Sequence, residues 1–321
     1  MRETALVTGA SGFLGRHLVR ALCDAGYPVV AWIRGAPAAP APAGARFEPW
    51  PRLEALNDAL ARLEHPIIYH LAATADRNVS DPLAHFDNNI RLTASLIEAG
   101  AQAGARGFVH AGSCTEYGVV PDRVRVAETA PLAARDLYGA SKAAAGIWAQ
   151  AVARQAGLGF AWARLFALYG PGLRSPRLLP TIHAALREKH SVDLTPGSQV
   201  LDWLYVGDAV AALLRLGRHA GSGGQGAFNL CTGHARTMRE VATMFAERMG
   251  GDARLLRFGA LAGRQNEPPW LVGDPAAARA LGWSADTDIT AGLDATIAAL
   301  DREKDGQAQA SVEQAARGRE P

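Results

Sequence analysis

Tyr138 and Lys142 are the residues of this chain whose types and spacing first suggest chemistry. They stand four residues apart in the stretch LYGASK (137–142), and the Ala-rich run that follows, 143–155, predicts a helix. On a helix, side chains four residues apart lie on one face. An ammonium group beside a phenol favours the phenolate, which suits the phenol to proton transfer. Taken alone, the pair has a simpler interpretation, a partly exposed tyrosine and a solvated lysine.

A glycine-rich segment near the start, TGASGFLG (8–15), predicts a dinucleotide-binding loop. It follows the apolar run 5–7 and precedes helical periodicity over 16–25, after which 27–33 predicts a second buried strand. The first glycine permits a tight turn, the second lets the backbone approach a pyrophosphate, and the third lets the helix pack against the strand. The amides at the helix N-terminus would then face the phosphates. Such glycines are weak evidence alone but strong between a strand and a helix. The residues predicted to bind the cofactor here are Gly9, Ser11, Gly12, Phe13, Leu14 and Gly15.

The end of the second predicted strand indicates which dinucleotide binds. A carboxylate there would bind the ribose 2′-hydroxyl of NAD, whereas an arginine suits the 2′-phosphate of NADP. The chain has Arg34 at this place and no acid nearby. Arg34 could simply be a solvated loop charge, but the missing acid also favours NADP(H). We therefore expect NADP(H), with NAD(H) as the alternative.

Two later predicted strands carry polar residues. His70 lies in the strand 66–73, and we interpret it as a hydrogen-bonded core histidine rather than a catalytic base. The strand 108–113 ends at Ser113. Carboxyl ends of parallel strands are where doubly wound sheets bind ligands. A hydroxyl there, with the Tyr138 helix next in sequence, predicts a three-group site, although Ser113 could instead cap a turn.

Strand and helix signals alternate along the chain, which predicts the α/β class with a doubly wound parallel sheet. Further strands are expected at 160–166, 200–206 and 227–230, and further helices at 53–63, 88–104, 178–187, 209–218, 237–249, 275–281 and 289–300. Residues 301–321 are charged, rich in Gln and Ala, and lack an apolar face. They predict a frayed helix or a disordered tail.

The composition excludes several classes of protein. Hydrophobic residues make up 49% and charged residues 20%, which is typical of a soluble globular protein. The formal net charge of +2 favours neither nucleic acid nor an anionic membrane as a partner. No window approaches the ~20 apolar residues of a membrane-spanning helix, and the first residues do not resemble a signal peptide. The three cysteines, Cys23, Cys114 and Cys231, are widely spaced, which favours reduced thiols over a disulfide scaffold or a zinc site. We expect a cytoplasmic protein.

Several motifs in this order resemble those of the extended short-chain dehydrogenase/reductases, and more narrowly their nucleotide-sugar epimerase/dehydratase/reductase branch. The motifs are the glycine loop, HLAA (70–73), Ser113, YGASK (138–142), RLFALYGPG (164–172), LDWLYVGD (201–208), FNL (228–230) and LGW (281–283). The likeness runs from about residue 4 to about residue 298. It implies a dinucleotide-binding domain at 1–170, to which 200–231 returns, and a smaller C-terminal substrate domain from 171–199 and 232–300. It also implies a homodimer, formed through the helices 89–104 and 138–155.

The resemblance assigns roles to individual residues. Tyr138 would be the acid/base, Lys142 would bind the nicotinamide ribose and favour the phenolate, and Ser113 would hydrogen-bond the reacting oxygen. These three are the predicted catalytic residues. The cofactor contacts implied beyond the glycine loop and Arg34 are Leu71, Ala72, Ala73, Asn89, Tyr138, Lys142 and Leu165, with Asn89 also supporting the site architecture.

Departures from the family pattern narrow the chemistry. The family's 4,6-dehydratases carry an Asp-Glu pair directly after the site hydroxyl, where this chain has Cys114 and Thr115, and Glu116 comes one place too late. Dehydration is therefore not expected. Ala167 and Leu201 replace an Asn and an Arg that often help hold the nucleotide diphosphate. The predicted substrate-binding residues are Ser113, Cys114, Thr115 and Arg264, the last either a diphosphate ligand or a plain loop charge.

The function expected from these features is NADP(H)-dependent reduction of a nucleotide-activated 4-keto-6-deoxysugar, with Tyr138 donating the proton. The segment VDLTPGSQ (192–199) is also similar to that of CDP-deoxyhexose 4-ketoreductases. One alternative is a nucleotide-sugar 4-epimerase that uses the same residues and keeps its NAD tightly bound. Another is a non-catalytic dinucleotide-binding protein, because a fold does not determine a function. Proteins of that kind commonly lose the Tyr or the Lys, and both are present here.

Overall fold

The structure is a computed structural model that describes residues 3–37, 40–74, 81–121, 123–263 and 268–317. The chain divides into two compact units, each of which is discontinuous in sequence. Unit 1 comprises Met1–Leu168, Val200–Ala235 and Asn266–Ala285, and unit 2 comprises Tyr169–Gln199, Arg236–Gln265 and Asp286–Pro321. None of the helices that the structure describes is both long enough and apolar enough to span a bilayer.

Unit 1 is built on a seven-stranded parallel sheet, which confirms the predicted fold class. Its strands lie in the order β10-β6-β5-β4-β1-β2-β3. Their bounds are β1 Ala5–Thr8, β2 Val29–Ile33, β3 Ala45–Pro49, β4 Ile67–His70, β5 Gly107–Ser113, β6 Gly159–Leu165 and β10 Gln225–Leu230. The chain runs outward from β1 in one direction through β2 and β3, and in the other through β4, β5 and β6. The carboxyl ends of β1 and β4 therefore flank a topological switch point, where open α/β sheets bind ligands.

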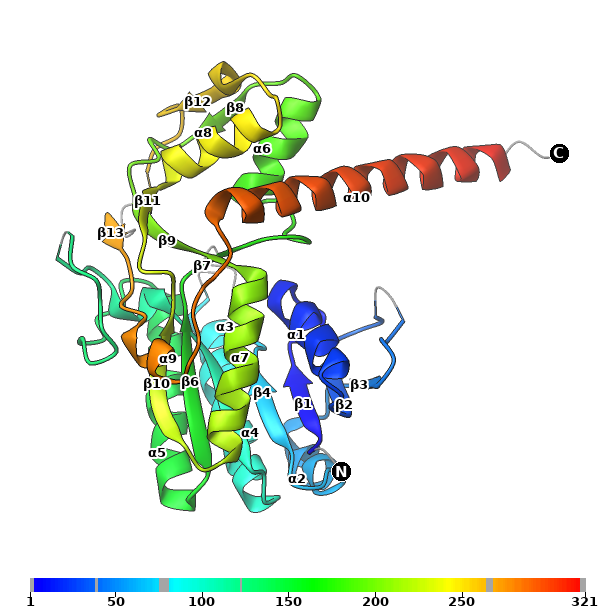
Figure 1. The fold of residues 1–321 in the computed structure, drawn as a ribbon. Helices are drawn as coiled ribbons and strands as arrows, with labels where there is room; N and C mark the ends of the chain where they lie inside the picture. Colours follow the sequence, from blue (N-terminus) through cyan, green and yellow to red (C-terminus); the bar gives the residue numbers. More distant parts are fainter. Residues whose placement is uncertain (1–2, 38–39, 75–80, 122, 264–267, 318–321) are drawn as a thin grey trace. The chain divides into compact units, whose positions relative to one another are not determined.

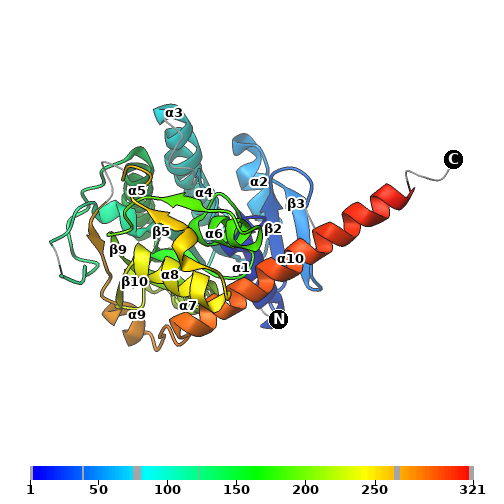
Figure 2. The same ribbon diagram turned by 90° about the horizontal axis from the view of Figure 1, so that it is seen from above.

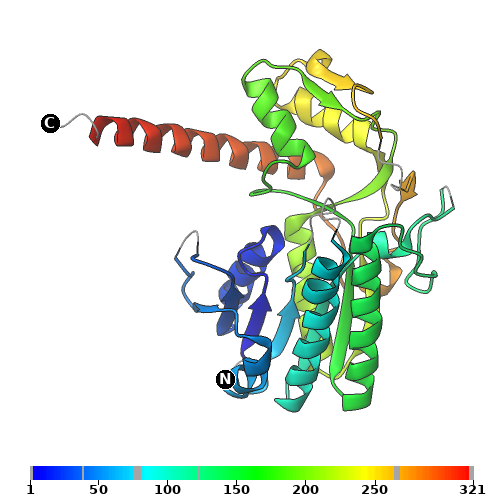
Figure 3. The ribbon, with the colours of Figure 1, turned by 180° about the vertical axis from the view of Figure 1, so that it is seen from behind.

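Helices cover both faces of this sheet. On one face lie α1 (Phe13–Asp24) and α7 (Val206–Gly221), in front of the strands in Figure 1. On the other lie α2 (Leu56–Ala61), α4 (Leu92–Gln102) and α5 (Leu137–Ala156), and Figure 3 shows α4 and α5 side by side.

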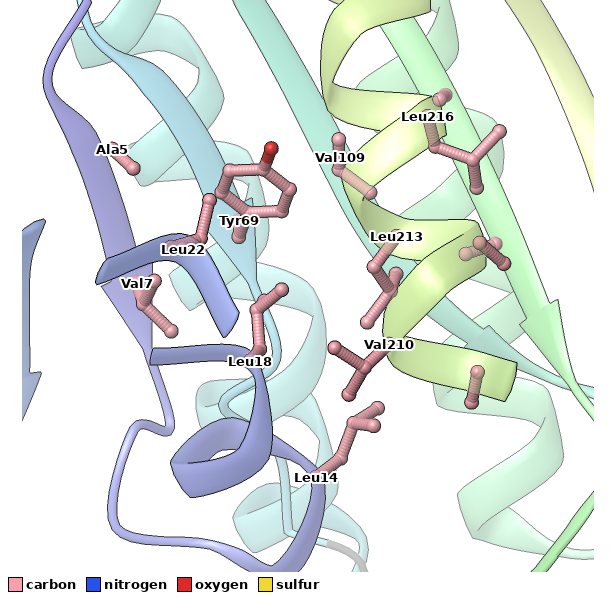
Figure 4. Close-up of a cluster of buried hydrophobic side chains, with 14 of the residues drawn as sticks. Ala5, Val7, Leu14, Leu18, Leu22, Tyr69, Val109, Val210, Leu213 and Leu216 are labelled. Atoms are coloured by element: carbon pink, nitrogen blue, oxygen red, sulfur yellow. The ribbon is translucent and has the colours of Figure 1, made fainter. Parts of the chain in front are cut away.

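Two hydrophobic cores separate the sheet from its helices, because successive side chains of a strand point to opposite faces. Within β5, Phe108 packs into the core beneath α2, α4 and α5, whereas Val109 packs into the core beneath α1 and α7. Figure 4 shows the second of these cores. There Leu14, Leu18 and Leu22 of α1 meet Val210, Leu213 and Leu216 of α7 over Val7, Tyr69 and Val109.

Unit 2 contains α6 (Leu178–Arg187), α8 (Met238–Arg248) and the start of α10 (Ile289–Arg317), which pack together (Figure 2). Two short strands, β8 (Val192–Leu194) and β12 (Leu256–Phe258), pair in parallel beside them. The helix α10 continues past the predicted end at Leu300, in line with the helical alternative for this tail. Asp301, in the first turn beyond that point, accepts hydrogen bonds from His183 Nε2 at 2.8 Å and from Arg187 Nη2 at 2.5 Å.

One predicted domain boundary also needs correction. The segment Asn266–Ala285, expected in the substrate domain, belongs to unit 1. Its strand β13 (Trp270–Leu271) pairs with β9 (Val200–Tyr205), and Trp283 is buried in the core beneath α1 and α7. The remaining elements are η1 Leu53–Ala55, α3 Pro82–His85, η2 Phe86–Arg91, η3 Cys114–Tyr117, β7 Ala167–Tyr169, β11 Ala235–Thr237, η4 Ala253–Leu255 and α9 Ala276–Ala280.

Candidate active site

The glycine loop connects β1 to α1 and has no room for side chains at two positions. Gly9 adopts φ +68°, and a Cβ there would lie 2.7 Å from the Ala72 amide nitrogen. A Cβ on Gly15 would lie 2.1 Å from the Gly9 carbonyl oxygen. Gly12 is the N-cap of α1, whose first turn has neither an acidic residue nor a side-chain cap. The N-terminal amides of α1 are thus available to an anion.

A cavity of about 380 Å³ opens above this loop, entirely within unit 1. It is lined by Gly9, Ser11, Gly12, Phe13, Leu14, Gly15, Trp32, Arg34, Trp50, Leu71, Ala72, Ala73, Ala111, Gly112, Tyr138, Lys142, Leu165 and Leu168. Every predicted cofactor residue except Asn89 is in this wall. The prediction missed Trp32, Trp50, Ala111, Gly112 and Leu168. The glycine loop forms a cradle that has no side chains at Gly9 and Gly15. This cradle and the size of the cavity fit a dinucleotide.

One end of the cavity carries two tryptophans and Arg34. Trp32 lies at the end of β2 and meets Trp50 edge-on, with ring centroids 5.8 Å apart. The Arg34 guanidinium is 5.9 Å from the Trp50 ring centroid, and its Nη2 donates to Asn88 Oδ1 at 3.1 Å. Among the described residues that line the cavity, no aspartate or glutamate occurs. This end therefore offers a cation and aromatic faces rather than a carboxylate.

The other end is formed by Tyr138 and Lys142 of α5. This helix begins after Asp136, whose Oδ1 accepts the Gly139 N–H at 2.7 Å as an N-cap. Tyr138 is half-buried, while Lys142 is only 2% exposed. Burial lowers the pKa of Lys142 to about 8, against the opposing charge of Glu116. The two predicted proton-transfer groups thus share one cavity, and the ammonium group is held away from water.

Ser113 ends β5 and is the N-cap of the short helix η3. Its Oγ accepts the Thr115 N–H at 3.2 Å and lies 2.9 Å from Thr115 Oγ1. Ser113 therefore does cap a turn, and its hydroxyl group is paired with the hydroxyl group of Thr115. Ser113, Cys114 and Thr115 are not among the lining residues, although Ala111 and Gly112 directly before them are. The structure brings this segment to the edge of the cavity rather than into its wall.

Asn89 lies beneath the site instead of in the cavity. It belongs to the π-helical segment η2, a type of turn that is frequent at functional sites. Its Nδ2 donates to Ser141 Oγ at 2.8 Å and to the Thr74 carbonyl oxygen at 3.2 Å, and its Oδ1 accepts the Thr74 N–H at 2.7 Å. The described partners of this fully buried amide are protein groups. The role it has here is to tie α5 to the segment after β4.

His70 is a buried histidine with both ring nitrogens bonded, as expected for a core residue. Thr93 Oγ1–H donates to the Asn89 carbonyl oxygen at 2.6 Å, so His70 Nε2 must be the donor in its 3.0 Å bond to Thr93. Burial and the charge of Lys142 lower the pKa of His70 to about 3, so the ring is neutral. His70 Nδ1 therefore accepts from the hydroxyl of Thr8 at 2.8 Å. This chain of bonds connects the start of the glycine loop to α4.

Glu116, which follows the predicted substrate-binding residues Cys114 and Thr115, is separate from the cavity. Glu116 turns into the interior, where it pairs with Arg164 of β6 instead of lining the cavity. Arg264 lies outside the described residues. Sequence reasoning could have recognised Glu116 as part of a capping box, because Ser113 precedes it by three residues.

The chain matches, over residues 5–231, the model of the NAD dependent epimerase/dehydratase family. The chain belongs to this family. Its resemblance to the extended short-chain dehydrogenase/reductases is thereby confirmed, and the protein is an enzyme of that group.

Its relatives act on different nucleotide sugars. The chain is 29% identical to a dTDP-glucose 4,6-dehydratase of Streptomyces griseus, over 93% of this chain and 94% of the relative. It is 26% identical to a CDP-abequose synthase of Salmonella typhimurium, over 94% of this chain and 99% of the relative. Among solved structures, MoeE5 in complex with UDP-glucose and NAD superposes with a TM-score of 0.84 at 30% identity, covering 94% of this chain and 99% of that one.

Proposed function

We propose that this member of the family catalyses the NADPH-dependent reduction of a nucleotide-activated 4-keto-6-deoxysugar. The observation that carries the proposal is the composition of one cavity. It joins the glycine cradle to Tyr138 and Lys142, with no carboxylate in its described wall and with Cys114 and Thr115 at its edge. Elimination of water needs an acid and a base, whereas reduction of a ketone needs a hydride and one proton donor.

Arg34 supports NADPH over NADH. Its guanidinium lies at the tryptophan end of the cavity, where a 2′-phosphate would form charge-assisted hydrogen bonds. A 2′-hydroxyl would instead call for a carboxylate, which the described lining does not provide. NADPH, when bound, would supply a hydride to the C4 carbonyl carbon.

The residues of the chain would complete that reduction. Tyr138 would donate its phenolic proton to the developing alkoxide and then recover a proton from solvent. Lys142 would remain cationic and so favour the phenolate that this transfer leaves behind. The hydroxyl of Ser113 would hydrogen-bond the reacting oxygen, and Thr115 would orient that hydroxyl through their 2.9 Å contact.

The partner and the location follow from the same proposal. On α5, Ile147 is 57% exposed and Trp148 is 52% exposed, and Leu83 and Phe86 are further exposed apolar residues on α3 and η2, which pack beside α5. We infer that a second copy of this chain covers this face, making a homodimer. Sedimentation analysis should show a dimer for the wild type and a monomer for Trp148→Glu. A nucleotide sugar, NADPH and three cysteines outside any disulfide all suit the cytoplasm, with a role in deoxysugar biosynthesis.

The test of the function is NADPH oxidation against a panel of nucleotide 4-keto-6-deoxysugars. We expect stoichiometric NADPH consumption with at least one member of the panel, and its loss in Tyr138→Phe. Interconversion of two nucleotide sugars without consumption of added cofactor would instead indicate a 4-epimerase. No turnover of either kind, or full activity in Tyr138→Phe, would overturn the proposal.

A further inference from the structure

Glu116 is a carboxylate in the interior of unit 1, immediately behind the site. Its side chain is completely buried, and it accepts three hydrogen bonds. The Ser113 N–H donates to its Oε1 at 2.7 Å, and the indole of Trp162 donates to the same oxygen at 3.4 Å. Arg164 Nε donates to its Oε2 at 3.1 Å. Burial raises the pKa of Glu116 to about 7, whereas the charge of Arg164 and the hydrogen bond from Ser113 act to lower it, so the carboxylate is ionised at mildly alkaline pH.

The position of Trp162 brings Glu116 beside the catalytic helix. A Cβ on Gly146 of α5 would lie 2.1 Å from the Trp162 ring, and a Cβ on Gly112 of β5 would lie 2.3 Å from its Nε1. The indole is therefore packed tightly between β5 and α5. Gly146 follows Lys142 by four residues, so both face the same side of α5. A Cβ on Gly112 would also lie 2.6 Å from Glu116 Oε1, and Gly112 and Lys142 line the same cavity, so the carboxylate stands directly behind the wall that carries Lys142.

We propose that Glu116 is a positioning residue of this active site: its buried carboxylate fixes the Ser113 end of the site and keeps Lys142 cationic. The inference rests on the roles proposed above for Ser113 and Lys142. The hydrogen bond from the Ser113 N–H to Glu116 fixes the backbone at the end of β5, and this in turn fixes the position of the Ser113 hydroxyl. The negative charge of Glu116 keeps Lys142 cationic, because burial alone disfavours the charged form of a lysine.

The other groups around Lys142 do not replace this charge. His70 of β4 and His110 of β5 are both neutral, because burial lowers the pKa of His70 to about 3 and that of His110 well below its usual value. Arg164 of β6 is a cation, and it also donates to the Tyr117 hydroxyl at 2.8 Å and the Glu128 carbonyl oxygen at 2.9 Å. The negative charge of Glu116 raises the pKa of Lys142 against the larger, opposite effect of burial.

The composition of the chain allows the charge of Lys142 to be measured directly. The whole sequence contains three lysines, Lys142, Lys189 and Lys304. Protein grown with lysine labelled with ¹³C at Cε should give three side-chain signals, which Lys189→Arg and Lys304→Arg assign. The Cε shift reports protonation of each amine without substrate or cofactor. This readout therefore remains valid whether or not the protein proves to be a ketoreductase.

In Glu116→Gln we expect the titration midpoint of Lys142 to fall by about one pH unit or more, a tenfold loss in proton affinity. A glutamine has one acceptor oxygen, so it cannot serve both Ser113 and Arg164, and this variant could lose stability. The double variant Glu116→Gln/Arg164→Met removes the ion pair as a whole, which is tolerated better than half of it. Its Lys142 midpoint should also be lowered.

Glu128→Gln is the matched control. Glu128 is a partly buried acid of the same network that bonds the Asn229 N–H at 2.7 Å and does not contact Ser113. Its loss should leave the Lys142 midpoint unchanged. With an active substrate, the alkaline limb of the kcat profile should move with the Lys142 midpoint. A wild-type midpoint in the folded double variant, or an equal shift in Glu128→Gln, would overturn the proposal.

Discussion

The glycine cradle and the Tyr138 end of the cavity are built in different ways. The cradle consists of backbone amides and apolar surface, and its shape is determined within the eight residues 8–15 and the strand beside them. The Tyr138 end depends on buried polar groups from several elements, including Glu116 of η3, His70 of β4 and Asn89 of η2. A short motif can thus specify a binding cradle completely, whereas proton-transfer chemistry depends on burial that distant segments create.

The largest effect should come from removing the phenol at the polar end. We expect Tyr138→Phe to lower kcat for the reactive substrate about 10²- to 10⁴-fold, because the proton donor is lost. The dissociation constant for NADPH, measured by fluorescence titration, should stay within about threefold, since the cradle is unchanged. Tyr27→Phe, which removes a hydroxyl outside the cavity, is the control. Equal losses in turnover and NADPH binding would contradict the separation of the cradle from the Tyr138 end.

A substitution in the glycine loop should have the converse effect, because it should weaken cofactor binding. In Gly15→Ala the new methyl would meet backbone atoms, 2.1 Å from the Gly9 carbonyl oxygen and 2.8 Å from Ala10 Cα, so the loop must shift. We expect NADPH affinity, measured by calorimetry, to fall at least about tenfold, and the free energy of unfolding to fall by roughly 1–3 kcal/mol. Gly263→Ala adds a methyl group with no heavy atom within 4 Å and should change neither. Unchanged NADPH affinity in Gly15→Ala would show that the loop does not hold the cofactor.

This contrast also explains which parts of the site could be predicted. The cofactor residues of the glycine loop and of the end of β4 line one cavity because each is defined by its neighbours in sequence. Trp50 was missed because its place beside Arg34 depends on the pairing of β2 with β3, in which Ile33 lies opposite Pro49. That pairing joins segments across an irregular loop, and no local signal specified it.

The Tyr138 end of the cavity, which is its polar end, shows more clearly what the sequence could not predict. The π-helical turn of η2 directs the Asn89 amide toward Thr74 and Ser141, partners that the sequence motif does not indicate. Glu116 was judged by its place in a motif, whereas its surroundings are set by Trp162 and Arg164, about fifty residues later in the chain. Segment 266–285 was misplaced for the same reason, since β13 has to pair with a strand far from it in sequence.

A smaller effect should distinguish cofactors at the tryptophan end. Arg34→Ala should weaken NADPH binding about 10- to 100-fold, because charge-assisted hydrogen bonds to a phosphate contribute roughly 1.5–3 kcal/mol. NADH binding should change little, since NADH lacks the 2′-phosphate. The ratio of the two dissociation constants, measured at two salt concentrations, checks this, with Arg62→Ala as an exposed control. An unchanged ratio of the two dissociation constants would instead favour NAD(H) as the cofactor.

The smallest predicted effect concerns the two histidines behind the polar end, which are neighbours in the register of β4 and β5. His70 has both nitrogens hydrogen-bonded, whereas neither nitrogen of the buried His110 has a partner among the described residues. Burial holds the pKa of His110 well below 6.5, so the unfolded state binds a proton in mildly acidic solution that the folded state does not.

The sign of the pH dependence follows from this difference in proton binding. Each buried, neutral histidine contributes to the free energy of unfolding, and this contribution is fully present above about pH 6.5. It falls by about 1.4 kcal/mol per histidine between pH 7.5 and 5.5. His110→Phe removes one such group together with two unsatisfied nitrogens, so its stability at pH 7.5 should be close to that of the wild type. Urea unfolding at both pH values should show that the variant loses about 1 kcal/mol less on acidification than the wild type does. His234→Gln, which removes an exposed imidazole, should not show this reduction. An equal acid loss in His110→Phe and the wild type would mean that His110 is charged in the folded protein, and the polar end would then contain a cation that competes with Lys142 for Glu116.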